Sequence, residues 1–136
     1  MSNRHNARKA AVQALYQWDI TQQLAHEIGP QFEQIHDMQN LDRKYLREVL
    51  EQIPKLSDQL EQDISPYIGR DFDTLDPVER AILRLGAYEL KHRLDVPTKV
   101  VMNEMIEVAK VFGSEHSYKF INGVMDKLGK QLRKKI

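Results

Sequence analysis

The chain has 136 residues, of which 41% are hydrophobic and 29% charged, a composition typical of one compact helix-rich domain rather than a disordered chain. It contains no cysteine, so disulfides, thiolate metal sites and thiol catalysis are excluded. The sequence has no signal-peptide core and no apolar run of membrane-spanning length. We therefore expect a cytoplasmic protein with no membrane partner.

The formal net charge is zero, but the charges are unevenly distributed. Residues 1–9 carry three basic side chains and no acid, and residues 127–136 carry five basic side chains and no acid. The stretch between them holds 12 basic and all 20 acidic residues. Such basic ends can form an anion-binding patch despite a neutral isoelectric point. They can equally be solvated tails, and charge alone does not decide between these interpretations.

Apolar spacing predicts helices through the N-terminal half. Residues 6–22 carry small apolar side chains at spacings of three and four, which predicts a helix that packs closely against its neighbours. Pro30 can open a short helix that runs through Met38. Asp42 can cap the next helix, and Pro54 should kink or break it because a proline removes a backbone donor.

The sharpest helix start lies at Asp76-Pro77-Val78-Glu79. Asp76 suits the N-cap, Pro77 the first helical position and Glu79 the third, an arrangement that resembles a capping box. This segment predicts a helix that ends near His92.

Two more helices follow toward the C-terminus. Pro97 marks the start of the first, and Gly113 predicts its end in a left-handed conformation. The last helix should begin at Ser114 or Ser117. No stretch alternates with period two for long, so no strand is expected.

The predicted fold is therefore all-α, with about six or seven helices in a single domain. No linker rich in proline, glycine or serine divides the chain. A seam around residues 68–74 divides it into an N-terminal helical subdomain of about residues 1–70 and a C-terminal one of about residues 71–136, which share one core.

Catalytic signatures are absent from the sequence. It has no phosphate-binding glycine loop, nucleophile elbow or dinucleotide fingerprint, and no two histidines have the spacing of a helical zinc site. Glu104 and Glu107 could face one way on a helix, but no Glu-x-x-His motif accompanies them, and salt bridges are the simpler explanation. We expect a protein that is not an enzyme and that binds neither a cofactor nor a metal.

A binding surface is the remaining hypothesis. Arg4, Arg8 and Lys9 lie at the start of the first helix, where they could contact phosphates, and Tyr16 could stack on an unpaired base.

A second candidate cluster surrounds the junction of the last two helices and comprises Phe112, His116, Lys119 and Phe120. At helical spacing, however, phenylalanines are more often core residues, and His116 can be an ordinary loop residue. Tyr67 falls in a predicted loop, where a half-buried tyrosine is the simpler interpretation.

Three long stretches resemble one known family. Residues 7–16 resemble the opening helix of NusB proteins, and residues 77–90 their central helix. Residues 96–104, 109–113 and 119–125 together resemble their C-terminal signature. The stretches are in order and properly spaced, so the resemblance covers essentially the whole chain. It implies two small helical bundles packed together, and a protein that binds the boxA RNA element together with the ribosomal protein NusE. Such a complex joins RNA polymerase during antitermination, notably on ribosomal RNA operons.

The resemblance also assigns roles to residues. Arg4 and Arg8 match the basic N-terminal arm of the family, with Lys9 beside them. The positions that lie at or near RNA in the family correspond to Tyr16, Tyr67, Phe112, His116 and Phe120, with Lys119 next to them. Tyr16 and Glu79, with the adjacent Arg80, fall near the meeting point of RNA and NusE. This chain departs from the family in two places, since its arm has fewer arginines and His116 stands where an acid is often found.

Two alternatives remain open. One is a NusB-like domain of the kind attached to RNA cytosine methyltransferases, against which the end of the chain at Ile136 argues. The other is a helical adaptor or homodimer that binds only protein, with the basic ends incidental. Some members of the resembled family dimerise through the RNA face, so a dimer could also be an auto-inhibited form.

Overall fold

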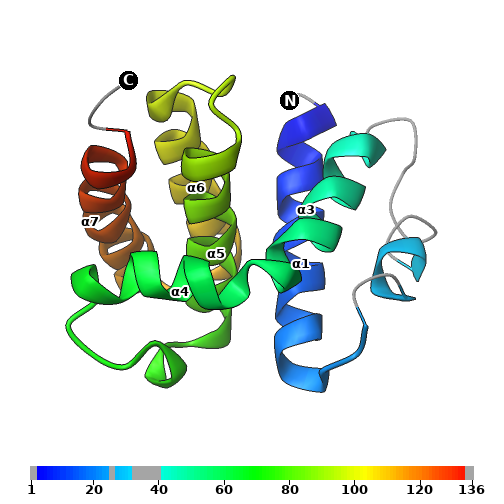
Figure 1. Ribbon diagram of the computed structural model, residues 1–136, viewed down its shortest axis with the longest axis horizontal. Coiled ribbons are helices and arrows are strands. Elements are labelled where there is room, and N and C mark those ends of the chain that lie inside the picture. The colour runs from blue at the N-terminus through cyan, green and yellow to red at the C-terminus, as the bar shows by residue number, and fades with distance from the viewer. Residues whose placement is uncertain (1–2, 25–26, 32–40, 134–136) are drawn as a thin grey trace.

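The computed structural model describes residues 3–24, 27–31 and 41–133, and all regular structure in these ranges is helical (Figure 1). The elements with defined bounds are α1 (Asn3–Thr21), α3 (Arg43–Lys55), α4 (Ser57–Ile64), the 3₁₀ turns η2 (Ser65–Tyr67) and η3 (Phe72–Thr74), α5 (Pro77–His92), α6 (Thr98–Phe112) and α7 (Glu115–Leu132). The all-α prediction is confirmed. In the described ranges, no helix combines the length and the apolar character needed to cross a membrane.

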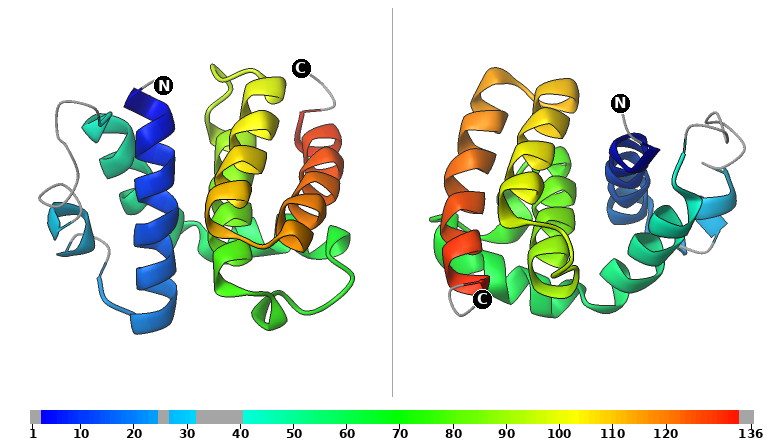
Figure 2. Two further views of the ribbon diagram at one scale, coloured as in Figure 1. Left: turned by 180° about the vertical axis from the view of Figure 1, so that it is seen from behind. Right: turned by 90° about the horizontal axis from the view of Figure 1, so that it is seen from above.

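Helix α5 is the central element of the fold. Every residue from Ala81 to Leu90 is buried, and α5 packs against α1, α6 and α7 (Figure 2). Gly86 allows this close packing, because a Cβ atom there would lie only 2.6 Å from the Met125 side chain of α7. A larger residue at this position would force the Met125 side chain to move.

Helix α1 packs on α5 and α3 through small side chains. Ala7, Ala10, Ala11 and Ala14 are all completely buried, as the predicted stripe requires. Because alanine has the highest intrinsic helix propensity and the smallest side chain, this helix can be both stable and close to its neighbours.

Three predicted helix starts are confirmed by their caps. Asp42 Oδ1 accepts a hydrogen bond from the Tyr45 backbone N–H at 3.0 Å, and Asp76 Oδ1 accepts one from the Val78 N–H at 2.8 Å. Ser114, rather than the alternative Ser117, caps α7, since its hydroxyl accepts from the Ser117 N–H at 3.3 Å. Each cap satisfies a backbone donor that the helix itself leaves unpaired.

The expected break at Pro54 is confirmed. Pro54 lies in the last turn of α3, which ends at Lys55, and α4 starts two residues later in a new direction (Figure 1). Helix α4 then packs against α5 and α7, whereas α3 packs mainly on α1. The position of the boundary between the two subdomains stays a prediction. The short helix expected from Pro30 to Met38 is described only at residues 27–31, which are helical, and residues 32–38 lie outside the described residues.

The conformation expected for Gly113 is wrong. Its φ of −104° and ψ of −179° are extended, not left-handed, although α6 does end there. Glycine is needed for space instead, because a Cβ atom would lie 2.7 Å from Ser117 Cβ and 2.9 Å from the Ala109 carbonyl oxygen. The short connection between α6 and α7 depends on this missing side chain.

Candidate functional site

The start of α1 is fixed against the start of α3. Arg4 Nε donates to Asp42 Oδ2 at 3.3 Å, and the Arg4 guanidinium lies 5.3 Å from the centre of the Tyr45 ring. The Asp42 backbone N–H also donates to the Asn3 carbonyl at 3.1 Å. The side chain of Arg4 is still 36% exposed, so it can meet a phosphate from solvent.

Arg8 differs from the expectation that it faces phosphate. Its side chain is only 3% exposed, and Nε and Nη2 donate to the two oxygens of Glu89, each at 2.8 Å. Its Nη1 donates to Glu104 at 3.0 Å. Around this centre, Tyr45 Oη donates to Glu89 at 2.5 Å, and His5 Nδ1 lies 2.6 Å from Glu104. With its guanidinium enclosed by carboxylates of α5 and α6, Arg8 holds α1 in place.

The charges inside this network are stabilised by their neighbours. Burial alone would lower the pKa of Arg8, but its hydrogen bond to Glu89 and the Glu89 charge outweigh burial and raise the pKa above its ordinary value. Burial and the charge of Glu89 raise the pKa of Tyr45 well above its ordinary value. Arg8 is therefore a cation and Tyr45 a neutral donor at neutral pH.

The residues of α1 that are expected to face RNA differ in their exposure to solvent. Tyr16 is 41% exposed, whereas Lys9 is half-buried. Ile20, four residues after Tyr16, is 52% exposed and lies on the same side of the helix. Sequence spacing had suggested Tyr16 but not its exposed apolar neighbour. The ring of Tyr16 is thus available for stacking.

The cluster at the α6–α7 junction divides into two groups. Phe112 and Phe120 are half-buried and pack against the hydrophobic core, as does Tyr67 in η2. His116 and Lys119 are exposed on the first turns of α7, and Lys119 Nζ lies 3.6 Å from Glu115 of the same helix. The phenylalanines therefore have a structural role, and each keeps part of its surface open.

Glu79 occupies the third position of α5, as predicted. Its carboxylate accepts a hydrogen bond from Ser117 Oγ of α7 at 3.0 Å. The side chain thus links the starts of two helices, and it remains half-buried at their junction.

Arg80, expected to face a partner, binds within the chain instead. Its Nε donates to Asp19 Oδ2 of α1 at 2.7 Å. Its Nη1 donates to the carbonyls of Asp73 and Leu75 at 3.0 and 2.9 Å. The side chain is 13% exposed, so its main effect is to hold the η3 loop against α1 and α5.

Arg84, one turn further along α5, was not predicted as a site residue. Its guanidinium lies between two rings, 5.1 Å from the centre of Trp18 and 4.9 Å from that of Phe72. Its Nη1 is 3.0 Å from Asp19 Oδ2, close enough for an ion pair but not aligned for a hydrogen bond. An arginine in an apolar stripe gives no sequence signal for this role.

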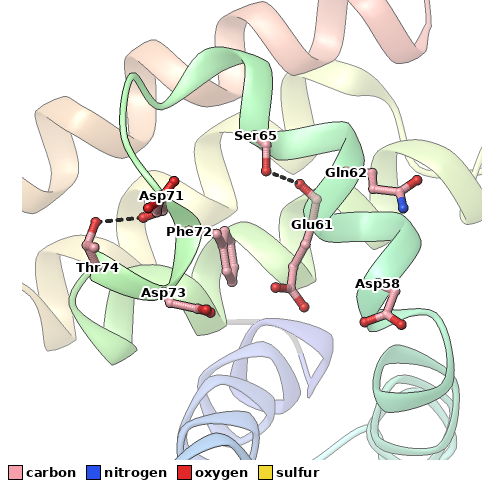
Figure 3. Close-up of a pocket in the computed structure, with 8 residues that line it drawn as sticks. All are labelled: Asp58, Glu61, Gln62, Ser65, Asp71, Phe72, Asp73 and Thr74. Atoms are coloured by element: carbon pink, nitrogen blue, oxygen red, sulfur yellow. Dashed lines mark hydrogen bonds between the residues drawn. The ribbon is translucent and has the colours of Figure 1, made fainter.

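An acidic pocket of about 460 Å³ opens between α4 and the η3 loop (Figure 3). We define the acidic pocket by its lining residues Asp58, Glu61, Gln62, Ser65, Asp71, Phe72, Asp73 and Thr74. Four of them are carboxylates, and none is basic. In Figure 3, the Phe72 ring lies between Asp71 and Asp73 on one side and Glu61 on the other, with Asp58 beyond Glu61. The sequence could not show this pocket, because it forms only when the chain reverses between residues 65 and 71.

Among the described residues, no group of three or more histidine, cysteine, aspartate or glutamate side chains is placed to hold a metal ion. The four carboxylates of the acidic pocket suit cationic groups, such as lysine and arginine side chains.

The fold and these surfaces together define a class, a helical binding protein with one basic and one acidic face. The model of the NusB family matches residues 5–130, and the chain belongs to that family. The resemblance noted from the sequence is confirmed.

Curated relatives agree with this assignment over their whole length. The chain is 48% identical over 135 residues to the transcription antitermination protein NusB of Actinobacillus pleuropneumoniae serotype 5b (strain L20), covering 99% of this chain and 98% of the relative. It is 49% identical over 135 residues to the protein of the same name from Haemophilus ducreyi (strain 35000HP / ATCC 700724), with the same two coverages.

Solved structures share the fold. T. maritima NusB superposes with a TM-score of 0.83 at 31% identity, covering 96% of this chain and 94% of the other. A chain in the crystal structure of the antitermination factors NusB and NusE in complex with double-stranded RNA gives a TM-score of 0.80 at 25% identity, covering 95% and 97%.

Proposed function

We propose that this protein is a non-catalytic transcription antitermination factor of the cytoplasm, which binds boxA-type single-stranded RNA together with NusE. In this proposal the complex joins the RNA polymerase antitermination complex and promotes transcription of ribosomal RNA operons. The observation that carries the proposal is the similarity, over 95% of the chain, to a chain in a crystal structure that contains NusB, NusE and RNA.

The proposed RNA face follows α1 from the arm toward its C-terminal half. Arg4 supplies an exposed cation at one end and Tyr16 an exposed ring about three turns further on. His116 and Lys119, both exposed, supply polar and cationic groups at the α6–α7 junction. Cations and rings in this combination bind a single strand through its phosphates and bases.

The proposed partner face is the acidic pocket with the adjoining helix starts. Its carboxylates attract a basic protein, and a ribosomal protein that binds RNA is rich in lysine and arginine. Glu79 adds a carboxylate at the start of α5, and Arg80 fixes the loop that carries Asp73. Arg80 therefore acts as a positioning residue for this face.

The experiment that tests the proposal is a titration of the protein with boxA-type RNA at several salt concentrations, in single-stranded and in duplex form. About three to five phosphate contacts give a slope of log K against log salt of roughly −2 to −3.5 for a single strand. NusE is then added, and we expect it to increase the RNA affinity. Binding that does not depend on salt would contradict the proposed phosphate contacts.

The same titrations, together with sedimentation of the protein with and without RNA, distinguish the alternatives. A protein-only adaptor binds NusE with an affinity that RNA does not change. If the protein is an auto-inhibited homodimer, RNA shifts its sedimentation from dimer to monomer, whereas a dimer unrelated to RNA binding stays intact. If the protein binds the duplex form and not the single strand, its ligand is duplex RNA rather than single-stranded RNA.

A further inference from the structure

Helix α3 begins with an accumulation of positive charge. Arg43, Lys44 and Arg47 lie within its first five residues, and all three side chains are exposed. The first turn contains no acid. Cations near a helix N-terminus face the positive end of the helix dipole, which is unfavourable for stability. The stability of helix α3 therefore does not explain why three cations lie at its start.

The acidic residue directly before α3, Asp42, already accepts hydrogen bonds through both of its carboxylate oxygens. Asp42 Oδ1 accepts the capping bond from the Tyr45 N–H, and Asp42 Oδ2 accepts from Arg4. Within the described part of the chain, neither Arg43 nor Lys44 has an ion-pair partner, whereas Lys55 at the other end of α3 lies 3.4 Å from Glu51. Among the described residues, the first turn of α3 thus presents positive charge that no ion pair neutralises.

This charged turn is continuous with the basic arm. The starts of α1 and α3 lie at the same end of the molecule (Figure 1), and the Asp42 N–H donates to the Asn3 carbonyl at 3.1 Å. The described part of the arm offers little free charge, because Arg8 is enclosed by Glu89 and Glu104 and Lys9 is half-buried, whereas the side chain of Arg4 is 36% exposed.

We propose that Arg43 and Lys44 form a second contact for the RNA backbone, which extends the RNA path from the arm across the first turn of α3. Exposed Arg47, one helical turn further on, lies beside this path. The inference rests on the proposed function and adds a site to it. The turn supplies the phosphate contacts that the short arm lacks, and it holds phosphates rather than bases because its side chains are cations without rings.

The test uses two RNAs, a boxA-type core and the same core extended by a short run of nucleotides at either end. We expect the wild-type protein to bind an extended RNA more tightly than the core. In the double variant Arg43→Gln/Lys44→Gln, this gain should disappear while core binding is retained. On the extended RNA, the slope of log K against log salt should become shallower by roughly 1.4, the value for two lost phosphate contacts on a single strand.

Two lysines of the same helix give a matched control. Lys44→Gln and Lys55→Gln make the same charge change at opposite ends of α3, both at exposed positions. Only Lys44→Gln should reduce the gain from extension, with a slope change of roughly 0.7. If both variants reduce it equally, the effect is one of overall charge and the inference is wrong.

The remaining outcomes are distinct. If the wild-type protein does not bind the core RNA, the proposed function fails and this inference fails with it. If it binds the core but binds neither extended RNA more tightly, only the inference is overturned. The same holds if extension raises the RNA affinity of the double variant as much as that of the wild type.

Discussion

The arm end and the acidic pocket are built in opposite ways. At the arm end, the exposed charges are cations such as Arg4, and the buried Glu89 and half-buried Glu104 bind Arg8 in the interior. At the acidic pocket, the exposed charges are carboxylates, and the buried Arg84 lies 3.5 Å from Glu61. A net charge of zero therefore conceals two faces that suit partners of opposite charge. At the arm end Asp42 holds the exposed Arg4, and at the acidic pocket the half-buried Arg80 donates to the backbone carbonyl of Asp73.

The largest effect should come from the buried network of the arm end. Glu89→Gln removes the charge that compensates Arg8, and breaking a buried ion pair costs about 3–5 kcal/mol of unfolding free energy. Urea denaturation followed by circular dichroism measures this loss. Glu107→Gln on the exposed side of α6 is the control, where a change within about 0.5 kcal/mol is expected. Equal losses in the two variants would mean that Arg8 does not depend on Glu89.

On the acidic side, Glu79→Gln separates a structural role from a binding role. The glutamine can still accept from Ser117 Oγ, so we expect little change in melting temperature. The lost charge should weaken NusE binding by about 1–3 kcal/mol, as for a charge-assisted hydrogen bond. Calorimetric titration with NusE, without and with RNA, measures the difference. Equal affinities of variant and wild type would confine Glu79 to its contact with Ser117.

Two aromatic residues sharpen the comparison within the RNA face. Tyr16→Leu should reduce RNA affinity by about 1–3 kcal/mol, the range for a base stacked on an aromatic ring, with little change in stability because the ring is exposed. Phe120→Leu should reduce both affinity and stability, because this ring also packs against the core. Binding assays combined with thermal melts distinguish the two. A Tyr16→Leu protein that melts earlier but binds normally would make Tyr16 a packing residue.

The smallest effect concerns alkaline pH. Burial and the Glu89 charge raise the pKa of Tyr45 above its ordinary value of 10.0, so the folded state holds this proton more tightly than the unfolded chain does. The resulting stability is complete below about pH 10 and is lost as the pH rises toward the folded pKa. Tyr45→Phe should therefore make unfolding free energy less sensitive to alkaline pH, which urea denaturation at several pH values can measure. Parallel losses in variant and wild type would contradict this.

The sequence predicted the elements that depend on local chemistry. The caps at Asp42, Asp76 and Ser114 and the break at Pro54 all follow from side chains within a few residues of the helix end. The left-handed conformation predicted for Gly113 was wrong, because the glycine is needed for the close approach of Ala109 and Ser117 and not for its backbone angle.

Site residues were harder to predict, because a charge in a sequence does not show its partner. Arg8 and Arg80 were assigned to RNA and to a protein, yet both bind carboxylates from distant helices, 81 and 61 residues away along the chain. The acidic pocket joins residues of α4 to the η3 loop and has no contiguous motif. Exposure of Tyr16, by contrast, agrees with its expected availability.

The central claim, that the two charged faces serve different partners, is tested most directly by one set of titrations. Arg4→Gln and Asp71→Asn/Asp73→Asn are each titrated with boxA-type RNA alone and with NusE alone. The account predicts that Arg4→Gln loses affinity for RNA and keeps its affinity for NusE, and that the pocket variant does the reverse. The assignment of the two faces would be contradicted if either variant lost affinity for both RNA and NusE. It would also be contradicted if Arg4→Gln lost affinity only for NusE or the pocket variant only for RNA.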